Sequence, residues 1–206
     1  MPAKIIIIDY GMGNLRSIIK RFERIGVPAE ITCDHAKIRE AGKLILPGVG
    51  HFLNGIKNLR DSGLIGLMNE KVLVKKTPIL GICLGMQLFA KSSEEGFSEG
   101  LGWLDATVVR FHVSDPVKFK IPHIGWNSVS PQKQSLLLNE ATENSMFYFV
   151  HSYYMVCNSK EDELGTTTYD YQFTSAIEKY NIFGTQFHPE KSFDSGLIVL
   201  QNFANL

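Results

Sequence analysis

The chain has 206 residues, of which 44% are hydrophobic and 20% are charged. These proportions are typical of a folded globular domain, and they exclude a disordered chain, a collagen and a coiled coil. The 21 basic and 21 acidic residues cancel, so we expect neither nucleic acid nor an anionic membrane surface as a partner.

Cysteine usage and hydropathy narrow the class further. The three cysteines, Cys33, Cys83 and Cys157, lie far apart and form no CxxC pair. This spacing predicts no disulfide framework and no metal site, and it favours reduced thiols in a cytoplasmic protein. The apolar run at residues 5–8 ends at Asp9. No apolar run reaches 18 residues, so we expect no membrane span.

The first half of the chain alternates short apolar segments with amphipathic ones. The pattern predicts strands at residues 4–9, 29–33, 43–46 and 78–82, and helices at residues 15–25, 52–59, 64–74 and 84–91. Fully apolar strands that alternate with helices favour a parallel sheet covered on both faces.

The second half is mostly strand-like. We predict strands at residues 106–111, 121–129, 147–157, 164–169, 173–179 and 182–187, and a closing helix at residues 195–205. Residues 92–102 are poor in apolar side chains and are predicted to form a mobile surface loop. The expected fold is one α/β domain over residues 1–206: a mostly parallel open sheet flanked by helices, with antiparallel strands added in the second half.

The strongest chemical signal is Cys83, which follows a buried strand within the pattern Gly81-Ile-Cys-Leu-Gly85. Small residues on both sides of a nucleophile allow the sharp strand-to-helix turn of a nucleophile elbow. Such a turn lies at the carboxyl end of the sheet, where open α/β sheets bind ligands. The alternative is a buried cysteine that packs as a small hydrophobic residue, which we prefer for Cys33 and Cys157.

A thiolate nucleophile needs a base and a group that orients the base. The segment His188-Pro189-Glu190 supplies both, because residues i and i+2 of an extended segment point to the same side. A carboxylate beside the imidazole fixes its tautomer, as in a catalytic triad. The alternative is a structural histidine with an unrelated surface glutamate.

A third segment, Pro47-Gly-Val-Gly50, follows a predicted parallel strand. Successive backbone N–H groups in such a turn form an anion-binding nest. They would stabilise the oxyanion made when an amide carbonyl is attacked, with the N–H of Leu84 as a second donor. The alternative is an ordinary turn.

These motifs together resemble class I (triad) glutamine amidotransferases, and more narrowly the glutaminase subunit of imidazole glycerol phosphate synthase. The resemblance spans the whole chain and rests on residues 9–14, 47–50, 81–87, 122–127, 149–154 and 186–192. It implies that Cys83 attacks the glutamine amide, that His188 shuttles protons and that Glu190 orients His188. It also implies an oxyanion site at Val49, Gly50 and Leu84, a glutamine site at Gly48, Gln87, His151 and Ser152, and no cofactor.

The same resemblance implies a partner: a (β/α)₈ cyclase subunit that receives ammonia in histidine biosynthesis, with low glutaminase activity when the partner is absent. Asn14, Trp126 and Lys191 match interface positions, although Trp126 is equally consistent with a core aromatic. Residues 100–105, 166–169 and 173–179 are instead reminiscent of relatives that feed an N-acetyl sugar amidotransferase, and Phe193 stands where the histidine-pathway pattern more often has glycine.

Two further alternatives come from other classes of protein. The first is a scaffold or glutamine sensor without catalysis, against which the intact Cys83, His188 and Glu190 argue. The second is a generic cysteine hydrolase of the same broad fold, which Gln87 and residues 47–50 disfavour.

Overall fold

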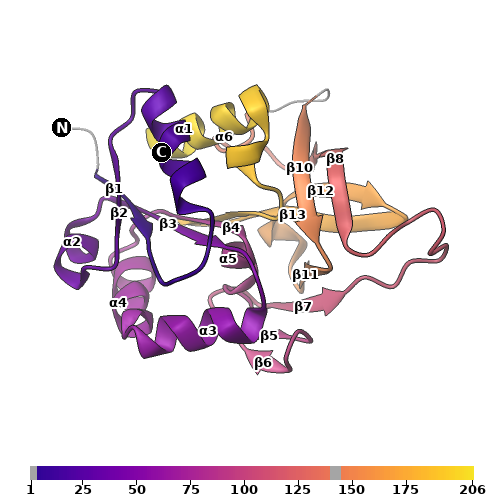
Figure 1. Cartoon of the computed structure of the whole chain (residues 1–206), viewed down its shortest axis with the longest axis horizontal. Helices are drawn as coiled ribbons and strands as arrows, with labels where there is room; N and C mark the ends of the chain where they lie inside the picture. Colours follow the sequence, from indigo (N-terminus) through magenta and orange to yellow (C-terminus); the bar gives the residue numbers. More distant parts are fainter. Residues whose placement is uncertain (1–3, 140–144) are drawn as a thin grey trace.

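The computed structural model describes residues 4–139 and 145–206. Within these residues, a 12-stranded sheet runs through the molecule with helices on both faces (Figure 1). Its first five strands are all parallel, in the spatial order β2 (Ala29–Thr32), β1 (Ile5–Ile8), β3 (Lys43–Gly48), β4 (Ile79–Cys83) and β14 (Ile182–Thr185).

Strand β1 shows why the sheet is covered on both sides. Ile5 and Ile7 pack into one cluster with the helices α1 and α6, whereas Ile6 and Ile8 pack into the other cluster with α2, α3 and α4. Successive side chains of a strand point to opposite faces, so a strand of four isoleucines needs two apolar layers. The five helices that form these two layers are α1 (Leu15–Arg24), α2 (His35–Glu40), α3 (Phe52–Asp61), α4 (Leu64–Asn69) and α6 (Phe193–Asn205).

The second half extends the sheet with mainly antiparallel pairs. Beyond β14 come β13 (Tyr171–Lys179), β11 (Tyr153–Cys157), β7 (Ala106–Arg110), β5 (Ser92–Ser93) and β6 (Ser98–Glu99). Strand β12 (Glu163–Tyr169) pairs with β13 and with β9 (Ser130–Pro131). The expected α/β fold, a parallel sheet with antiparallel additions, is therefore confirmed.

A separate two-stranded sheet is formed by β8 (His123–Ser128) and β10 (Met146–His151), which pair in antiparallel register (Figure 1). Burial alternates along both strands, as expected of a sheet with one solvent-facing side. Phe149 and His151 face the interior, whereas Trp126 and Met146 are exposed. This small sheet thus has an inner face toward the core and an outer face toward solvent.

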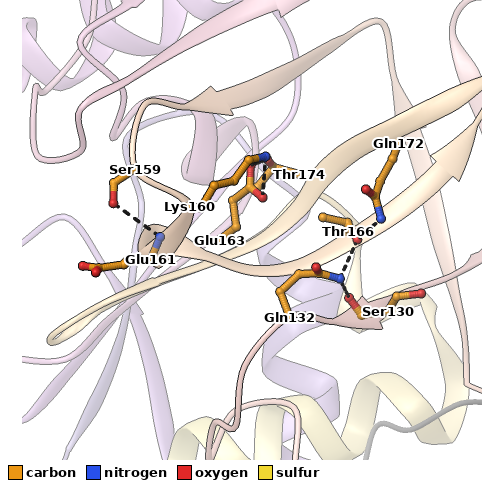
Figure 2. A network of polar contacts seen from close by, with 9 residues as sticks. All are labelled: Ser130, Gln132, Ser159, Lys160, Glu161, Glu163, Thr166, Gln172 and Thr174. Atoms are coloured by element: carbon orange, nitrogen blue, oxygen red, sulfur yellow. Dashed lines mark hydrogen bonds and ion pairs between the residues drawn. The ribbon is translucent and has the colours of Figure 1, made fainter.

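Polar side chains reinforce the far end of the molecule, where β12 meets β13 and β9 (Figure 2). Glu163 accepts hydrogen bonds from Lys160 and from Thr174, and the Thr166 hydroxyl accepts from both Gln132 and Gln172. Among the described residues, no helix is both long enough and apolar enough to cross a membrane.

Three predicted elements differ from the structure. The predicted helix at residues 84–91 ends early, since α5 covers only Leu84–Gln87. The predicted strand at residues 147–157 breaks at Ser152, where the chain passes from the small sheet to the large one. Apolar residues on both sides of His151 and Ser152 concealed the break, because strands of both sheets contribute to one core.

The third difference concerns residues 92–102, which were expected to form a mobile loop. Ser92 and Ser93 instead pair with β7 on one side and with β6 on the other, as short strands of the large sheet. Glu95 lies in the turn between β5 and β6, and its carboxylate accepts a 2.8 Å hydrogen bond from the backbone N–H of Phe52. The polar segment is therefore a short hairpin whose turn holds the start of α3.

Candidate active site

Cys83 ends strand β4 in a backbone conformation that few non-glycine residues adopt, with φ 54° and ψ −110°. The adjacent glycines make this turn possible. A Cβ on Gly81 would lie 2.6 Å from the backbone nitrogen of Met86, and one on Gly85 would lie 1.8 Å from the carbonyl oxygen of Leu46. The sequence Gly-x-Cys-x-Gly therefore builds a nucleophile elbow, in which the side chain of Cys83 is only 7% exposed.

The imidazole of His188 and the carboxylate of Glu190 meet as predicted. Nδ1 of His188 lies 2.8 Å from Oε1 of Glu190, and both side chains are buried. Among the described residues, Nε2 of His188 has no hydrogen-bond partner. Since Nδ1 is held by Glu190, it is Nε2 that is available for proton transfer in the cavity that His188 shares with Cys83.

The backbone around His188 is anchored from the small sheet. The N–H of His188 donates to the carbonyl of Tyr148 over 2.9 Å, and the N–H of Tyr148 donates to the hydroxyl of Ser192 over 3.0 Å. That hydroxyl donates in turn to the His188 carbonyl over 2.6 Å. On the other side, Nε of Arg21 donates to the carbonyl of Glu190. These bonds fix His188 between β10 and α1.

The electrostatics favour a charged imidazole. Burial acts to lower the pKa of His188, but the negative charge of Cys83 and the Glu190 carboxylate outweigh burial and raise the pKa to about 10. The raised pKa favours the imidazolium form of His188 at neutral pH, between the sulfur of Cys83 and the carboxylate of Glu190. An imidazolium is the form that can protonate a leaving amine.

The strand beside the elbow supplies the predicted oxyanion segment. Gly48 is the register partner of Cys83 in the parallel pair β3–β4, and the following residues Val49 and Gly50 line the same cavity as Cys83. Gly50 has φ +114°, a conformation that favours glycine. The hydroxyl of Tyr10 donates a 2.7 Å hydrogen bond to the Pro47 carbonyl and thereby anchors the start of this segment.

A cavity of about 190 Å³ opens at this point, at the carboxyl ends of β3 and β4. Of the predicted site residues, those that line it are Val49, Gly50, Cys83, Leu84, Gln87, His151, Ser152 and His188; further lining residues are Glu95, Val150 and Tyr153. Gly48 does not line the cavity, because it packs against α5: a Cβ there would lie 2.7 Å from the Gly85 nitrogen.

One wall of the cavity is formed by His151, which pairs with a second buried, neutral histidine, His123. Nδ1 of His151 lies 2.7 Å from the Tyr153 carbonyl, and Nε2 lies 3.1 Å from Nδ1 of His123. Burial lowers the pKa of His151 to about 3 and that of His123 to about 4. Since a carbonyl can only accept, His151 carries its proton on Nδ1 and accepts from His123 on Nε2. Both ring nitrogens of His151 are engaged, so its side chain shapes the wall.

The predicted interface residues lie apart from the cavity. Asn14 precedes α1 as its N-cap residue. Trp126 stacks on Phe193 with ring centroids 5.0 Å apart and an interplanar angle of 4°, and Lys191 lies over the ring of Tyr148. We call Trp126, Tyr148, Lys191 and Phe193 the aromatic patch. Phe193 is 64% exposed and Trp126 is 41% exposed, so Trp126 is not a core aromatic.

Residues 6–204 match the family model described as "Glutamine amidotransferase class-I". The chain belongs to this family. Solved structures of other members share its fold at low identity. The structure titled PurLQS from Thermotoga maritima gives a TM-score of 0.72 at 18% identity, with coverage of 100% of this chain and 99% of the other. The glutaminase domain of CTPS from Trypanosoma brucei gives 0.64 at 17%, with coverage of 98% and 94%.

Curated relatives of this glutamine amidotransferase are much more similar in sequence. "Imidazole glycerol phosphate synthase subunit HisH 2" of Methanococcus maripaludis is 53% identical, covering 97% of this chain and 98% of the relative. The protein of the same name from Pseudomonas aeruginosa is 46% identical, covering 98% and 99%. "Subunit HisH 1" of Campylobacter jejuni is 46% identical, covering 98% and 100%. The protein is thus an enzyme of the glutamine amidotransferase class.

Sequence reasoning missed several residues of this site. Gln186, Tyr153 and His123 form hydrogen bonds around the cavity, and Glu95 lines it. Gln186 stands in the motif with His188, which was the available signal. Glu95 gave none, because a glutamate in a polar segment reads as a surface residue.

Proposed function

We propose that the protein is the glutaminase subunit of an imidazole glycerol phosphate synthase, acting in histidine biosynthesis. The observation that carries this proposal is a cavity lined by the buried Cys83 and His188, with Glu190 bonded to His188, in a chain aligned nearly end to end with relatives of that name. The 12-stranded sheet passes through both halves of the chain, so we also propose that residues 1–206 act as one domain.

The thiolate of Cys83 attacks the side-chain carbonyl carbon of glutamine, and a C–S bond forms as the carbonyl π electrons move to oxygen. The N–H groups of Leu84 and of the Val49–Gly50 segment stabilise that oxyanion. The His188 imidazolium gives its proton to the amide nitrogen, the C–N bond breaks and ammonia leaves. Water, deprotonated by His188, then cleaves the glutamyl thioester to give glutamate and restores the Cys83 thiolate.

Glutamine recognition is assigned to Gln87 at the end of α5 and to the turn at Ser152. Gln87 commits both hydrogens of its amide nitrogen to protein acceptors, so its carbonyl oxygen is the atom left to accept from a substrate ammonium. Ser152 lies at the turn between β10 and β11 and offers a hydroxyl and a backbone N–H to the substrate carboxylate. His151 serves by holding this turn.

Ammonia made here needs an acceptor enzyme, which we propose is the cyclase subunit. Trp126 and Tyr148 project from the outer face of the small sheet, whose inner face carries His151. Exposed stacked aromatics are typical of interface anchors, and the aromatic patch gives the cyclase a docking surface, with Asn14 on a neighbouring loop. A cytoplasmic location fits a catalytic thiol that must stay reduced.

The test is glutaminase activity of the purified chain alone, with the cyclase subunit of the same organism, and with an N-acetyl sugar amidotransferase of that organism. Each mixture contains its acceptor substrate. We expect stimulation by the cyclase and little activity alone. Stimulation by the sugar enzyme alone would transfer the same chemistry to surface-polysaccharide synthesis. Failure of a glutamine-analogue label to modify Cys83 would instead indicate a scaffold.

A further inference from the structure

Gln186 is a buried polar residue that the triad mechanism does not use. It follows β14 and precedes His188 by two residues, and its side chain is fully buried. Its amide nitrogen lies 3.6 Å from the sulfur of Cys83, within hydrogen-bonding distance for sulfur. A buried amide normally uses its donors and acceptor, so each of its contacts carries information.

The direction of this amide is fixed by a chain of groups that begins at the cavity wall. The Tyr153 carbonyl can only accept, so the group 2.9 Å from it on Gln87 is the NH₂. The same nitrogen lies 2.9 Å from Gln186 and uses its second hydrogen there. The atom of Gln186 that receives this hydrogen must be its carbonyl oxygen. The NH₂ of Gln186 therefore points at the sulfur of Cys83.

The same carbonyl of Tyr153 also accepts from Nδ1 of His151 over 2.7 Å. Its two lone pairs are thus both used, and neither Gln87 nor His151 can reverse without placing an acceptor against the Tyr153 carbonyl oxygen, which can only accept. The hydrogen bonds from Tyr153 to Cys83 therefore allow only one assignment of donors and acceptors.

We propose that Gln186 is a positioning residue for the nucleophile, donating a hydrogen bond that holds the Cys83 thiolate in its attacking orientation, with the direction of its amide set through Gln87 by the Tyr153 carbonyl. This inference rests on the proposed role of Cys83. It gives the sulfur a donor separate from His188. A hydrogen bond to a charged group is stronger than one to a neutral group, so this contact stabilises the thiolate over the thiol.

The sharpest variant is Gln186→Glu, which keeps the shape and the acceptor for Gln87 but replaces the donor NH₂ with a carboxylate oxygen that faces the sulfur. Gln186→Met is the neutral companion, since it removes the donor without adding charge. Gln172→Glu is the matched control. It makes the same chemical change on β13, in the polar network of Figure 2, where Gln172 bonds to Thr166 and touches no cavity residue.

The measurement is the rate at which iodoacetamide alkylates Cys83 as a function of pH, followed by mass spectrometry of the Cys83 peptide. This readout needs no glutamine and no partner, so it is separate from the proposed function. We expect the pH of half-maximal rate to rise by about one unit in Gln186→Met, a tenfold change in thiolate fraction, and further in Gln186→Glu. Gln172→Glu should match the parent protein.

Glutaminase assays with the cyclase subunit give a second readout. Holding the thiolate acts on the chemical step, so kcat should fall about tenfold in Gln186→Met while KM changes less. An unchanged alkylation profile in a folded Gln186→Met protein would overturn the proposal, even if Gln186→Glu fails to fold. A normal shift in alkylation with no glutaminase activity in the parent protein would leave Gln186 in place and reject the proposed function.

Discussion

The elbow around Cys83 and the small sheet of β8 and β10 contribute to the same cavity in different ways. The elbow is held by backbone packing, since Gly81 and Gly85 allow contacts that no side chain would permit. The small sheet contributes through hydrogen bonds, because the Tyr148 backbone bonds to His188 and to Ser192. Cys83 is thus fixed by sterics within one motif, whereas His188 depends on a strand with an exposed outer face.

This difference suggests where a partner can act. A protein that docks on the aromatic patch touches Trp126 and Tyr148 and, through the backbone of β10, the element that holds His188. The elbow offers a partner no comparable exposed surface, because Cys83 is buried and α5 is buried along its whole length. Changes in the elbow should therefore remove catalysis or folding, and changes in the patch should alter assembly.

The largest effect is expected from Cys83→Ala, which removes the nucleophile. Glutamine hydrolysis in the complex with the cyclase should fall by on the order of 10⁴-fold or more. Circular dichroism and partner binding should not change, because the cavity loses only one sulfur atom. Residual turnover close to that of the parent would reject Cys83 as the nucleophile.

Gly85→Ala tests the steric half of the comparison. The new Cβ would lie 1.8 Å from the Leu46 carbonyl, and we expect the free energy of unfolding to fall by roughly 3 kcal/mol or more. Gly66→Ala in α4 is the control, since nothing lies within 4 Å of its Cβ, and it should be neutral or slightly stabilising in urea unfolding. Equal stability of the two variants would contradict the packing argument.

The charge on His188 is predicted to depend on the sulfur. The pKa of His188 is raised to about 10 against the lowering effect of burial, chiefly by the negative charge of Cys83. Cys83→Ser removes that charge, so less stabilises the imidazolium and the pKa must fall. An NMR titration of labelled histidines in both proteins measures this shift. An equal or higher His188 pKa in Cys83→Ser would show that the sulfur is not anionic.

The smallest effect is expected at the aromatic patch. Phe193→Ala should weaken binding to the cyclase subunit by about tenfold, through loss of the stacked pair with Trp126, and leave stability nearly unchanged. Tyr180→Ala is matched, because Tyr180 is also an exposed aromatic at positive φ, remote from the patch. Isothermal titration calorimetry of both variants with the cyclase subunit measures this difference. Equal affinities would show that the aromatic patch is not part of the interface.

Most of the fold and the triad were predictable because each depends on local patterns. Strand β4 with its flanking glycines, and the spacing of His188 and Glu190, encode geometry within a few residues. Phe193 and Gln186 gain their contacts only in the tertiary structure. Phe193 stacks on Trp126, 67 residues earlier in the chain, and Gln186 bonds to Cys83, 103 residues earlier.

The predicted elements failed where two sheets share one core. The mostly apolar pattern at residues 147–157, interrupted at His151 and Ser152, indicates that the segment is buried, but it does not show which sheet each half joins. The prediction of a mobile loop at residues 92–102 was wrong for the opposite reason, because the groups that hold this polar segment lie on other elements. The carboxylate of Glu95 accepts from the backbone N–H of Phe52, and that of Glu94 accepts from the backbone N–H of Arg110 over 2.8 Å.

The most direct test of the central claim is to trap the covalent intermediate. The chain is mixed with the cyclase subunit and glutamine, quenched in acid within the first turnover and digested, and the peptides are weighed. We predict a glutamyl group in thioester linkage on Cys83. A glutamyl group on Cys33 or Cys157, or rapid glutamine hydrolysis with no glutamyl group on Cys83, would contradict it.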